Sequence, residues 1–336
     1  MNPMDTIYLD NNATTRPAPE VIEAMHEALT ELWGNPSSIH RAGQAVRRKL
    51  DLARQSVAQL LGCKDRDLVF TSGGTEAANL AILGSLRAFE GAGIDKRVLV
   101  TTRIEHSAIR ETANRLAAEG HEIVWLPNDE DGVIDSAALA NLLNHRGHEI
   151  ALVAVMWSNN ETGVIQPIER IGALCQEHGV RFYTDGTQWV GKMPTDVSAL
   201  PVDLVSFAAH KFHGPKGAGG LYVKPRTRLL SQTIGGPQER QRRGGTENVP
   251  GFLGMGVAAE LAHRWLQGLD RQRFTDMRER FEHRILSEIE NTFINGAGAP
   301  RQWNTSNIAF AGLETEAIPI APLPRFMHVE VPPSHD

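Results

Sequence analysis

Short buried-strand patterns alternate with amphipathic helix patterns over most of this 336-residue chain. The alternation predicts strands at 67–71, 97–102, 122–126, 150–156, 181–184 and 204–207, with helices at 75–89, 107–119 and 168–178. Such a pattern is typical of a mostly parallel sheet with helices on both faces. In these sheets ligands bind just beyond the carboxyl ends of the strands. We therefore expect an α/β fold whose chemistry lies at one edge of the sheet.

The flanking regions have a different character. Further helices are predicted over 18–61, interrupted by a turn at 34–38, and over 254–265 and 274–289. We expect residues 1–17 to contribute to a small domain, 18–260 to form the large domain, 261–318 to begin the small domain and 319–336 to be an irregular proline-rich tail. Proline lacks the N–H that a helix needs, so Pro319, Pro322 and Pro324 argue against a helix there.

The composition narrows the functional class. Hydrophobic residues make up 41% of the chain and charged residues 22%, as in ordinary globular proteins. A net charge of −6 argues against nucleic acid or an anionic membrane as the partner. No apolar run approaches the roughly 18 residues of a membrane-spanning helix, and no secretory signal is visible, so we expect a cytoplasmic protein. Two cysteines are too few for a disulfide framework.

Two segments carry the strongest signals for cofactor chemistry. Thr71–Glu76 follows a predicted strand and opens a helix, and its glycines expose backbone N–H groups that can bind phosphate. Taken alone, it also fits an ordinary helix start capped by Thr75. Lys211 follows the strand ending at Phe207 in an apolar, glycine-rich setting, where desolvation lowers the pKa of an amine and makes it nucleophilic. Lys216 fits a solvated surface lysine.

Three more polar side chains follow other predicted strands. Asp185 could pair with the ring nitrogen of pyridoxal phosphate (PLP), His106 could stack on the ring and move protons, and Asn160 could bind a cofactor oxygen. The alternatives are a turn aspartate, a buried structural histidine and a polar turn. Because every one of these groups follows a strand, they converge on one sheet edge. Together they predict PLP held as a Schiff base on Lys211.

Several motifs resemble those of the cysteine desulfurases, a branch of the class V aminotransferases. They are Tyr8–Thr15, Gly34–Ser38 with His40, Thr71–Glu76, Asn159–Gly163 with Gln166 and Pro167, Asp185 with Gln188, His210–Lys211 and Arg243–Asn248. The resemblance extends from about Tyr8 to Glu316. It implies a fold-type-I PLP-dependent transferase with a mostly parallel seven-stranded sheet and a smaller α/β domain. It also implies a homodimer that converts L-cysteine to L-alanine and passes a persulfide to an iron–sulfur scaffold or another acceptor protein.

The same resemblance implies a role for individual residues. Lys211 would bind PLP and move the Cα proton of the substrate, and His106 would stack on the ring and assist that transfer. The other implied roles are phosphate binding by Gly74, Thr75, His210 and, from the neighbouring subunit, Thr246; ring binding by Asp185, Asn160 and Gln188, with Gln188 at the phenolic oxygen; and binding of the substrate carboxylate by Asn35.

Two departures from the family pattern stand out. Ala208 replaces the serine or threonine that usually binds phosphate three positions before the lysine, so one hydrogen bond should be missing. The loop that carries the persulfide cysteine is not found, and we expect Cys63 and Cys175 to be small buried residues instead. We therefore expect an incomplete small domain and impaired sulfur mobilisation.

The departures leave alternatives to an active desulfurase. One is a catalytically inactive PLP-binding remnant, and another is a related class V aminotransferase or selenocysteine lyase. The histidine pairs 210/213 and 145/148 have spacings that suggest metal, but no cysteine or carboxylate set accompanies them, so we expect no metal site.

Overall fold

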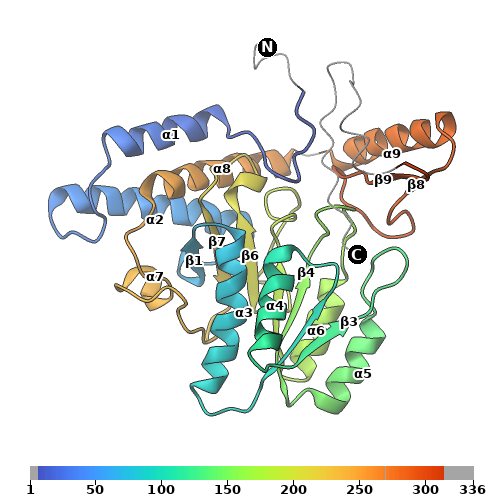
Figure 1. Ribbon diagram of the computed structural model, residues 1–336. Helices are drawn as coiled ribbons and strands as arrows, with labels where there is room; N and C mark the ends of the chain where they lie inside the picture. Colours follow the sequence, from blue (N-terminus) through green and yellow to red (C-terminus); the bar gives the residue numbers. More distant parts are fainter. Residues whose placement is uncertain (1–6, 269, 314–336) are drawn as a thin grey trace.

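The computed structural model describes residues 7–268 and 270–313, and a seven-stranded sheet lies at its centre (Figure 1). The strand order is β1-β7-β6-β5-β4-β2-β3. The strands are β1 (Leu68–Thr71), β2 (Val98–Thr102), β3 (Ile123–Leu126), β4 (Ile150–Met156), β5 (Arg181–Asp185), β6 (Leu204–Ala208) and β7 (Gly219–Val223). Strands β6, β5, β4, β2 and β3 run parallel, whereas β7 is antiparallel to both β6 and β1. The predicted mostly parallel α/β sheet is therefore confirmed.

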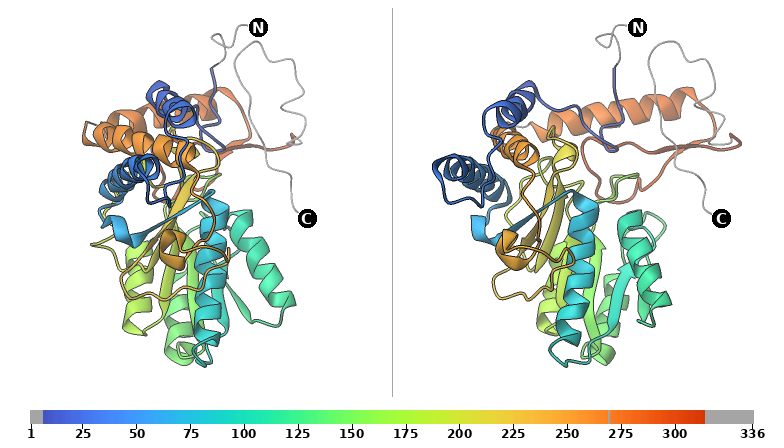
Figure 2. Two further views of the ribbon diagram at one scale, coloured as in Figure 1. Left: turned by 90° about the vertical axis from the view of Figure 1, so that its left-hand side faces the viewer. Right: turned by 60° about the vertical axis from the view of Figure 1, so that its left-hand side comes forward.

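Helices cover both faces of this sheet. They are α1 (Pro19–Thr30), α2 (Arg41–Leu61), α3 (Gly74–Glu90), α4 (Ser107–Ala118), α5 (Ser136–Arg146), α6 (Ile168–Glu177), α7 (Gln238–Gln241), α8 (Val249–Gln267) and α9 (Arg271–Glu288). Figure 2 shows α3 and α4 on one face, in cyan and teal, and α5 and α6 on the other, in green. Within the described residues, none of these helices is long and apolar enough to cross a membrane.

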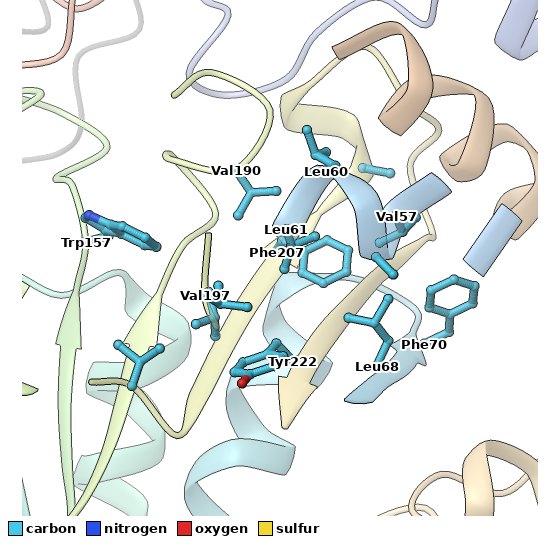
Figure 3. Close-up of a cluster of buried hydrophobic side chains, with 14 of the residues drawn as sticks. Val57, Leu60, Leu61, Leu68, Phe70, Trp157, Val190, Val197, Phe207 and Tyr222 are labelled. Atoms are coloured by element: carbon cyan, nitrogen blue, oxygen red, sulfur yellow. The ribbon is translucent and has the colours of Figure 1, made fainter. Parts of the chain in front are cut away.

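Two hydrophobic clusters fill the space between helices and sheet. Side chains alternate along each strand, so Val69 of β1 joins the cluster under α3 and α4, while Leu68 and Phe70 join the larger cluster on the opposite face. Figure 3 shows part of that larger cluster, where α2 packs against β1, β6 and β7. Phe207 is fully buried there, and burying a side chain of this kind contributes about 1.5–3 kcal/mol.

The sequence analysis did not predict strand β7 or helix α5 of the large α/β unit. Strand β7 begins with Gly219 and Gly220, and glycine is depleted in strands, so its local signal is weak. Helix α5 buries only Leu139 and Leu143, although Asp135 caps it by accepting hydrogen bonds from two backbone N–H groups of its first turn. Helix α8 begins at Val249, five residues before the predicted start, because the Asn248 side chain accepts a hydrogen bond from the Gly251 N–H.

A second unit follows the large sheet. Strands β8 (Thr292–Ile294) and β9 (Ile308–Phe310) form an antiparallel pair beside α9. A buried ion pair ties α9 to the loop between these strands, with Arg301 Nη1 2.6 Å from Glu282 Oε1. The last residues of the predicted 261–318 segment and the irregular tail predicted at 319–336 lie outside the described residues. The proposed domain boundaries stay predictions.

Candidate active site

The strand directions bring the predicted residues to one edge of the sheet. Strands β2, β4, β5 and β6 are parallel, and β1 points the same way because β7 is antiparallel to both β1 and β6. Their carboxyl ends therefore meet at a single edge. Lys211 follows β6 directly at the end of the short 3-10 helix Ala209–Lys211, and Asp185 is the last residue of β5. His106 and Asn160 lie in the loops after β2 and β4.

Lys211 lies against the N-terminal segment of the chain. Its Nζ donates to the backbone carbonyl of Asn12 and, at 2.8 Å, to that of Ala13. Burial lowers the pKa of this amine, and the negative charges of Asp185 and Asp10 partly oppose that effect. A lowered pKa increases the fraction of neutral, nucleophilic amine near pH 7.

Asp185 is a buried carboxylate held by two donors. Its Oδ1 accepts a hydrogen bond from the Thr187 N–H at 3.0 Å and one from Ser206 Oγ at 2.9 Å. Ser206 in turn is 2.8 Å from the hydroxyl of Tyr183, which is fully buried. These contacts fix the orientation of the carboxylate at the end of β5.

The amino end of α3 is open to a ligand. Gly73 is the N-cap and no side chain caps the helix, so the alternative in which Thr75 is the cap is wrong. A Cβ placed on Gly73 would meet nothing within 4 Å, whereas one on Gly74 would lie 3.1 Å from Thr187 Oγ1. The uncapped N–H groups and the helix dipole therefore face free space beside Gly73 and favour an anion such as phosphate.

The two site histidines differ in environment. The pKa of His210 falls to about 4, because burial and then the charges of Lys211, Lys216 and Lys192 disfavour the imidazolium. His210 is therefore neutral at pH 7. His106 is exposed rather than buried, and its Nδ1 accepts a hydrogen bond from the Ala108 N–H at 3.1 Å. An accepting Nδ1 leaves the proton of the neutral ring on Nε2.

Asn12 and Lys192 are site residues that the sequence did not single out. The Asn12 carbonyl accepts hydrogen bonds from Lys211 Nζ and, at 2.9 Å, from Gln188 Nε2. Its side-chain Nδ2 donates to the Asn160 carbonyl at 3.2 Å. Lys192 Nζ donates to Asn12 Oδ1 at 3.0 Å and to Gln188 Oε1 at 2.6 Å. The available signal was the spacing of four residues between Gln188 and Lys192, which brings the two side chains together in the turns after β5.

Two predicted residues make their contacts elsewhere. Asn35 is exposed between α1 and α2, and its Oδ1 accepts a hydrogen bond from the Ser37 N–H at 2.9 Å. Thr246 is exposed in the loop before α8. That loop is attached to the first turn of α3 by an ion pair in which Arg243 Nε is 2.9 Å from Glu76 Oε1. Their predicted roles stay predictions.

The two cysteines of the sequence are poor nucleophiles. Cys175 is buried in α6 as predicted, but Cys63 is half-buried rather than buried. Burial is the main cause that raises the pKa of each thiol to about 12. Because the thiolate is the reactive form, both side chains are almost entirely unreactive at pH 7.

The residues at this edge fit PLP. A desolvated amine, a buried carboxylate and an open helix start match the aldehyde, the pyridine nitrogen and the phosphate of that cofactor. Among residues 7–268 and 270–313, no group of three or more histidine, cysteine, aspartate or glutamate side chains is placed to hold a metal ion. The site geometry is that of a PLP-dependent enzyme.

Comparison with known proteins identifies the family. Residues 7–321 match the aminotransferase class-V family, and the chain therefore belongs to this family of PLP-dependent enzymes. Its relatives in this family include cysteine desulfurases. The chain is 43% identical over 315 residues to cysteine desulfurase 2 of Trichormus variabilis, and the aligned region covers 94% of this chain and 77% of that protein.

Solved structures agree with this relationship. A NifS-like protein matches with a TM-score of 0.86 and 33% identity, covering 94% of this chain and 84% of that one. A structure described as SspA in complex with cysteine matches with a TM-score of 0.79 and 30% identity, covering 91% and 84%. The predicted fold, cofactor and enzyme family are therefore confirmed.

Proposed function

We propose that the site around Lys211 removes sulfur from L-cysteine and yields L-alanine. The observation that carries this proposal is the desolvated Lys211 amine, held by the carbonyls of Asn12 and Ala13 at the same sheet edge as the buried Asp185. The related SspA structure, which was solved with cysteine, supports the choice of substrate.

Different side chains of this site bind the cofactor and transfer protons. Bound PLP supplies an electron sink that weakens the Cα–H bond of the substrate. Lys211 anchors the cofactor and moves the proton at the substrate Cα, because its lowered pKa suits an amine to act as a base. Asp185 keeps the pyridine nitrogen protonated. His106 stacks on the ring, and its Nε2–H assists the proton transfer.

The phosphate site lies mainly at the start of α3. The N–H groups of Gly74 and Thr75 bind the phosphate oxygens, and His210 contributes from the end of β6. Thr246 of a second subunit completes the phosphate site, and Asn35 holds the substrate carboxylate. Asn160 and Gln188 contact the ring.

A homodimer accounts for apolar side chains that one chain leaves exposed. Trp33 is 79% exposed and Ile39 95% exposed in the α1–α2 loop, and Ile234 is 92% exposed in the segment between β7 and α7. Contiguous apolar patches are typical of surfaces that associate, and we infer that these side chains contribute to such a patch in the dimer. We place the enzyme in the cytoplasm, with an iron–sulfur scaffold or a similar protein as the acceptor of sulfur.

Labelling of the cofactor amine tests the proposal. The PLP-loaded protein is reduced with borohydride and digested, and the modified peptide is identified by mass spectrometry. We expect the label on Lys211 and none in K211A, whereas K216A, which changes an exposed lysine, should label like the parent. A K211A protein that binds PLP with the same yellow colour would contradict the assignment. Alanine released from L-cysteine is measured in parallel.

A second candidate follows from the two thiols. With both pKa values near 12, neither Cys63 nor Cys175 is a suitable persulfide carrier. The chain then binds PLP and L-cysteine but releases sulfur slowly. Alanine formation well below one turnover per minute, with normal labelling of Lys211, would favour this candidate. Rapid formation of alanine and sulfide with a reductant present would exclude it.

A further inference from the structure

Lys192 is a buried amine inside the active site. Lys192 is 7% exposed. Its Nζ donates to two neutral amide oxygens, Asn12 Oδ1 at 3.0 Å and Gln188 Oε1 at 2.6 Å. The indole of Trp303 donates to the Lys192 carbonyl at 3.1 Å, which ties this turn to the loop between β8 and β9. The side chain is therefore held firmly in a place where a free lysine would be costly to bury.

The charges around Lys192 do not compensate its own. Burial and then the positive charge of Lys211 lower the pKa of Lys192 to about 7. The charge of Lys192 in turn lowers the pKa of His210, while the charge of Asp185 raises the pKa of Lys211. When Lys192 is protonated, its two hydrogen-bond partners are both neutral oxygens, so its charge adds a positive potential to the site. An anionic ligand bound beside Lys211 would offset it.

The contacts of Lys192 also decide how Gln188 is oriented. An ammonium group can only donate, so the Gln188 amide must turn Oε1 toward Lys192. Its Nε2 then faces the other way and donates to the Asn12 carbonyl at 2.9 Å, the same carbonyl that accepts from Lys211 Nζ. An amide NH₂ carries two N–H groups, and the Asn12 carbonyl takes one of them. Gln188 thus presents a donor, and not an acceptor, next to Lys211.

We propose that Lys192 is a positioning residue that locks the Gln188 amide with its N–H directed at an oxygen of the bound cofactor. Its second effect is a positive potential that favours the anionic form of the cofactor. This proposal rests on the proposed role of Lys211 as the cofactor amine. Lys192 acts through Gln188 and through its charge, and it does not itself take part in bond making.

The visible absorption band of the PLP-loaded protein reports on both effects. An N–H donated to a cofactor oxygen and a nearby positive charge each disfavour the protonated form of the link between Lys211 and the cofactor. In K192M we therefore expect the pH midpoint of the band to rise by about one unit and the Kd for PLP to increase roughly tenfold. K49M removes an exposed lysine of α2 that pairs with Glu27, and it should change neither value.

A double-mutant cycle with Q188A separates positioning from a purely structural role. If Lys192 acts through Gln188, the pH midpoint of K192M/Q188A should shift from the wild-type value by much less than the sum of the shifts in the two single variants. Additive shifts, or an unmoved midpoint in K192M, would overturn the proposal. Should K192M not fold, K192Q replaces it and is judged by the same criteria.

Borohydride labelling is measured on every variant. A wild-type protein without label on Lys211 would overturn the proposed function and, with it, the role of Lys192. A labelled Lys211 combined with an unmoved midpoint would overturn the role of Lys192 alone.

Discussion

Ser206 donates a hydrogen bond to Asp185 across neighbouring strands, with Oγ 2.9 Å from Oδ1. The two residues are direct partners in the β5–β6 register, and Asp185 is the last residue of its strand. The backbone pairing of two central strands thus determines the orientation of the carboxylate that we assign to the pyridine nitrogen. A side chain set by a sheet is more rigidly held than one on a loop.

Removing this hydroxyl should weaken cofactor binding. In S206A, Asp185 keeps the Thr187 N–H but loses one of two donors, and a hydrogen bond to a charged group contributes about 1.5 kcal/mol. We expect the Kd for PLP to rise roughly tenfold, as measured by equilibrium titration. Ser85 is a matched control, since its hydroxyl is buried in α3 without a hydrogen-bond partner in the described structure. An equal Kd in S206A and S85A would refute the prediction.

Restoring a hydroxyl at position 208 should have the opposite effect. Ala208 is buried, and its Cβ lies 3.7 Å from the place of a Cβ on Gly74, next to the open start of α3. A208S adds a donor there, so we expect PLP to bind about fivefold more tightly, equivalent to about 1 kcal/mol. The neighbouring A209S adds the same group where the Cβ packs against Gly214, and it should bring no gain.

Glu105 should make stability depend on pH. Its Oε1 accepts hydrogen bonds from Thr102 Oγ1 and the Met156 N–H, while its buried Oε2 has no hydrogen-bond partner in the described residues. Burial, the main cause, raises its pKa from 4.5 to about 8. The folded state therefore binds one proton more than the unfolded state between these values. The resulting stabilisation is complete below pH 4.5 and is lost as the pH rises through 8.

E105Q removes this titration. Relative to wild type, the unfolding free energy of E105Q should increase by about 4 kcal/mol between pH 5 and pH 9, measured by urea unfolding of the cofactor-free protein. E111Q, on an exposed position of α4, should track the wild type at every pH. A constant difference between E105Q and wild type across this range would show that Glu105 does not titrate there.

The ion pair between α9 and the β8–β9 loop should be essential for stability. Glu282 and Arg301 have side chains that are 6% and 7% exposed, and Arg278 lies beside them at 10%. E282A leaves two largely buried guanidinium groups without this carboxylate, so we expect a loss of about 3 kcal/mol in thermal or urea unfolding. Glu279, which is 59% exposed and pairs with Arg278, is the control, and E279A should change stability by less than about 0.5 kcal/mol.

Local sequence signals locate most of the chemistry along the chain. The strand patterns predict Lys211 and Asp185 at strand ends, and the structure places them there because parallel strands bring their carboxyl ends to one edge. Strand β7 is not predicted because its two glycines weaken the strand signal. Thr75 fits a cap by residue type, but the N-cap is Gly73, two residues earlier.

Local sequence patterns specify the alternation of strands and helices and the positions of the reactive groups along the chain. These features depend on periodicity and on residues close in sequence. The orientation of Gln188 comes instead from long-range packing, because it depends on Asn12, 176 residues away, and on the burial of Lys192. The same packing brings Asn12 into contact with Thr305 across 293 residues. Such contacts arise when distant segments are packed together, and no local pattern records which atom an amide will turn toward a buried ammonium.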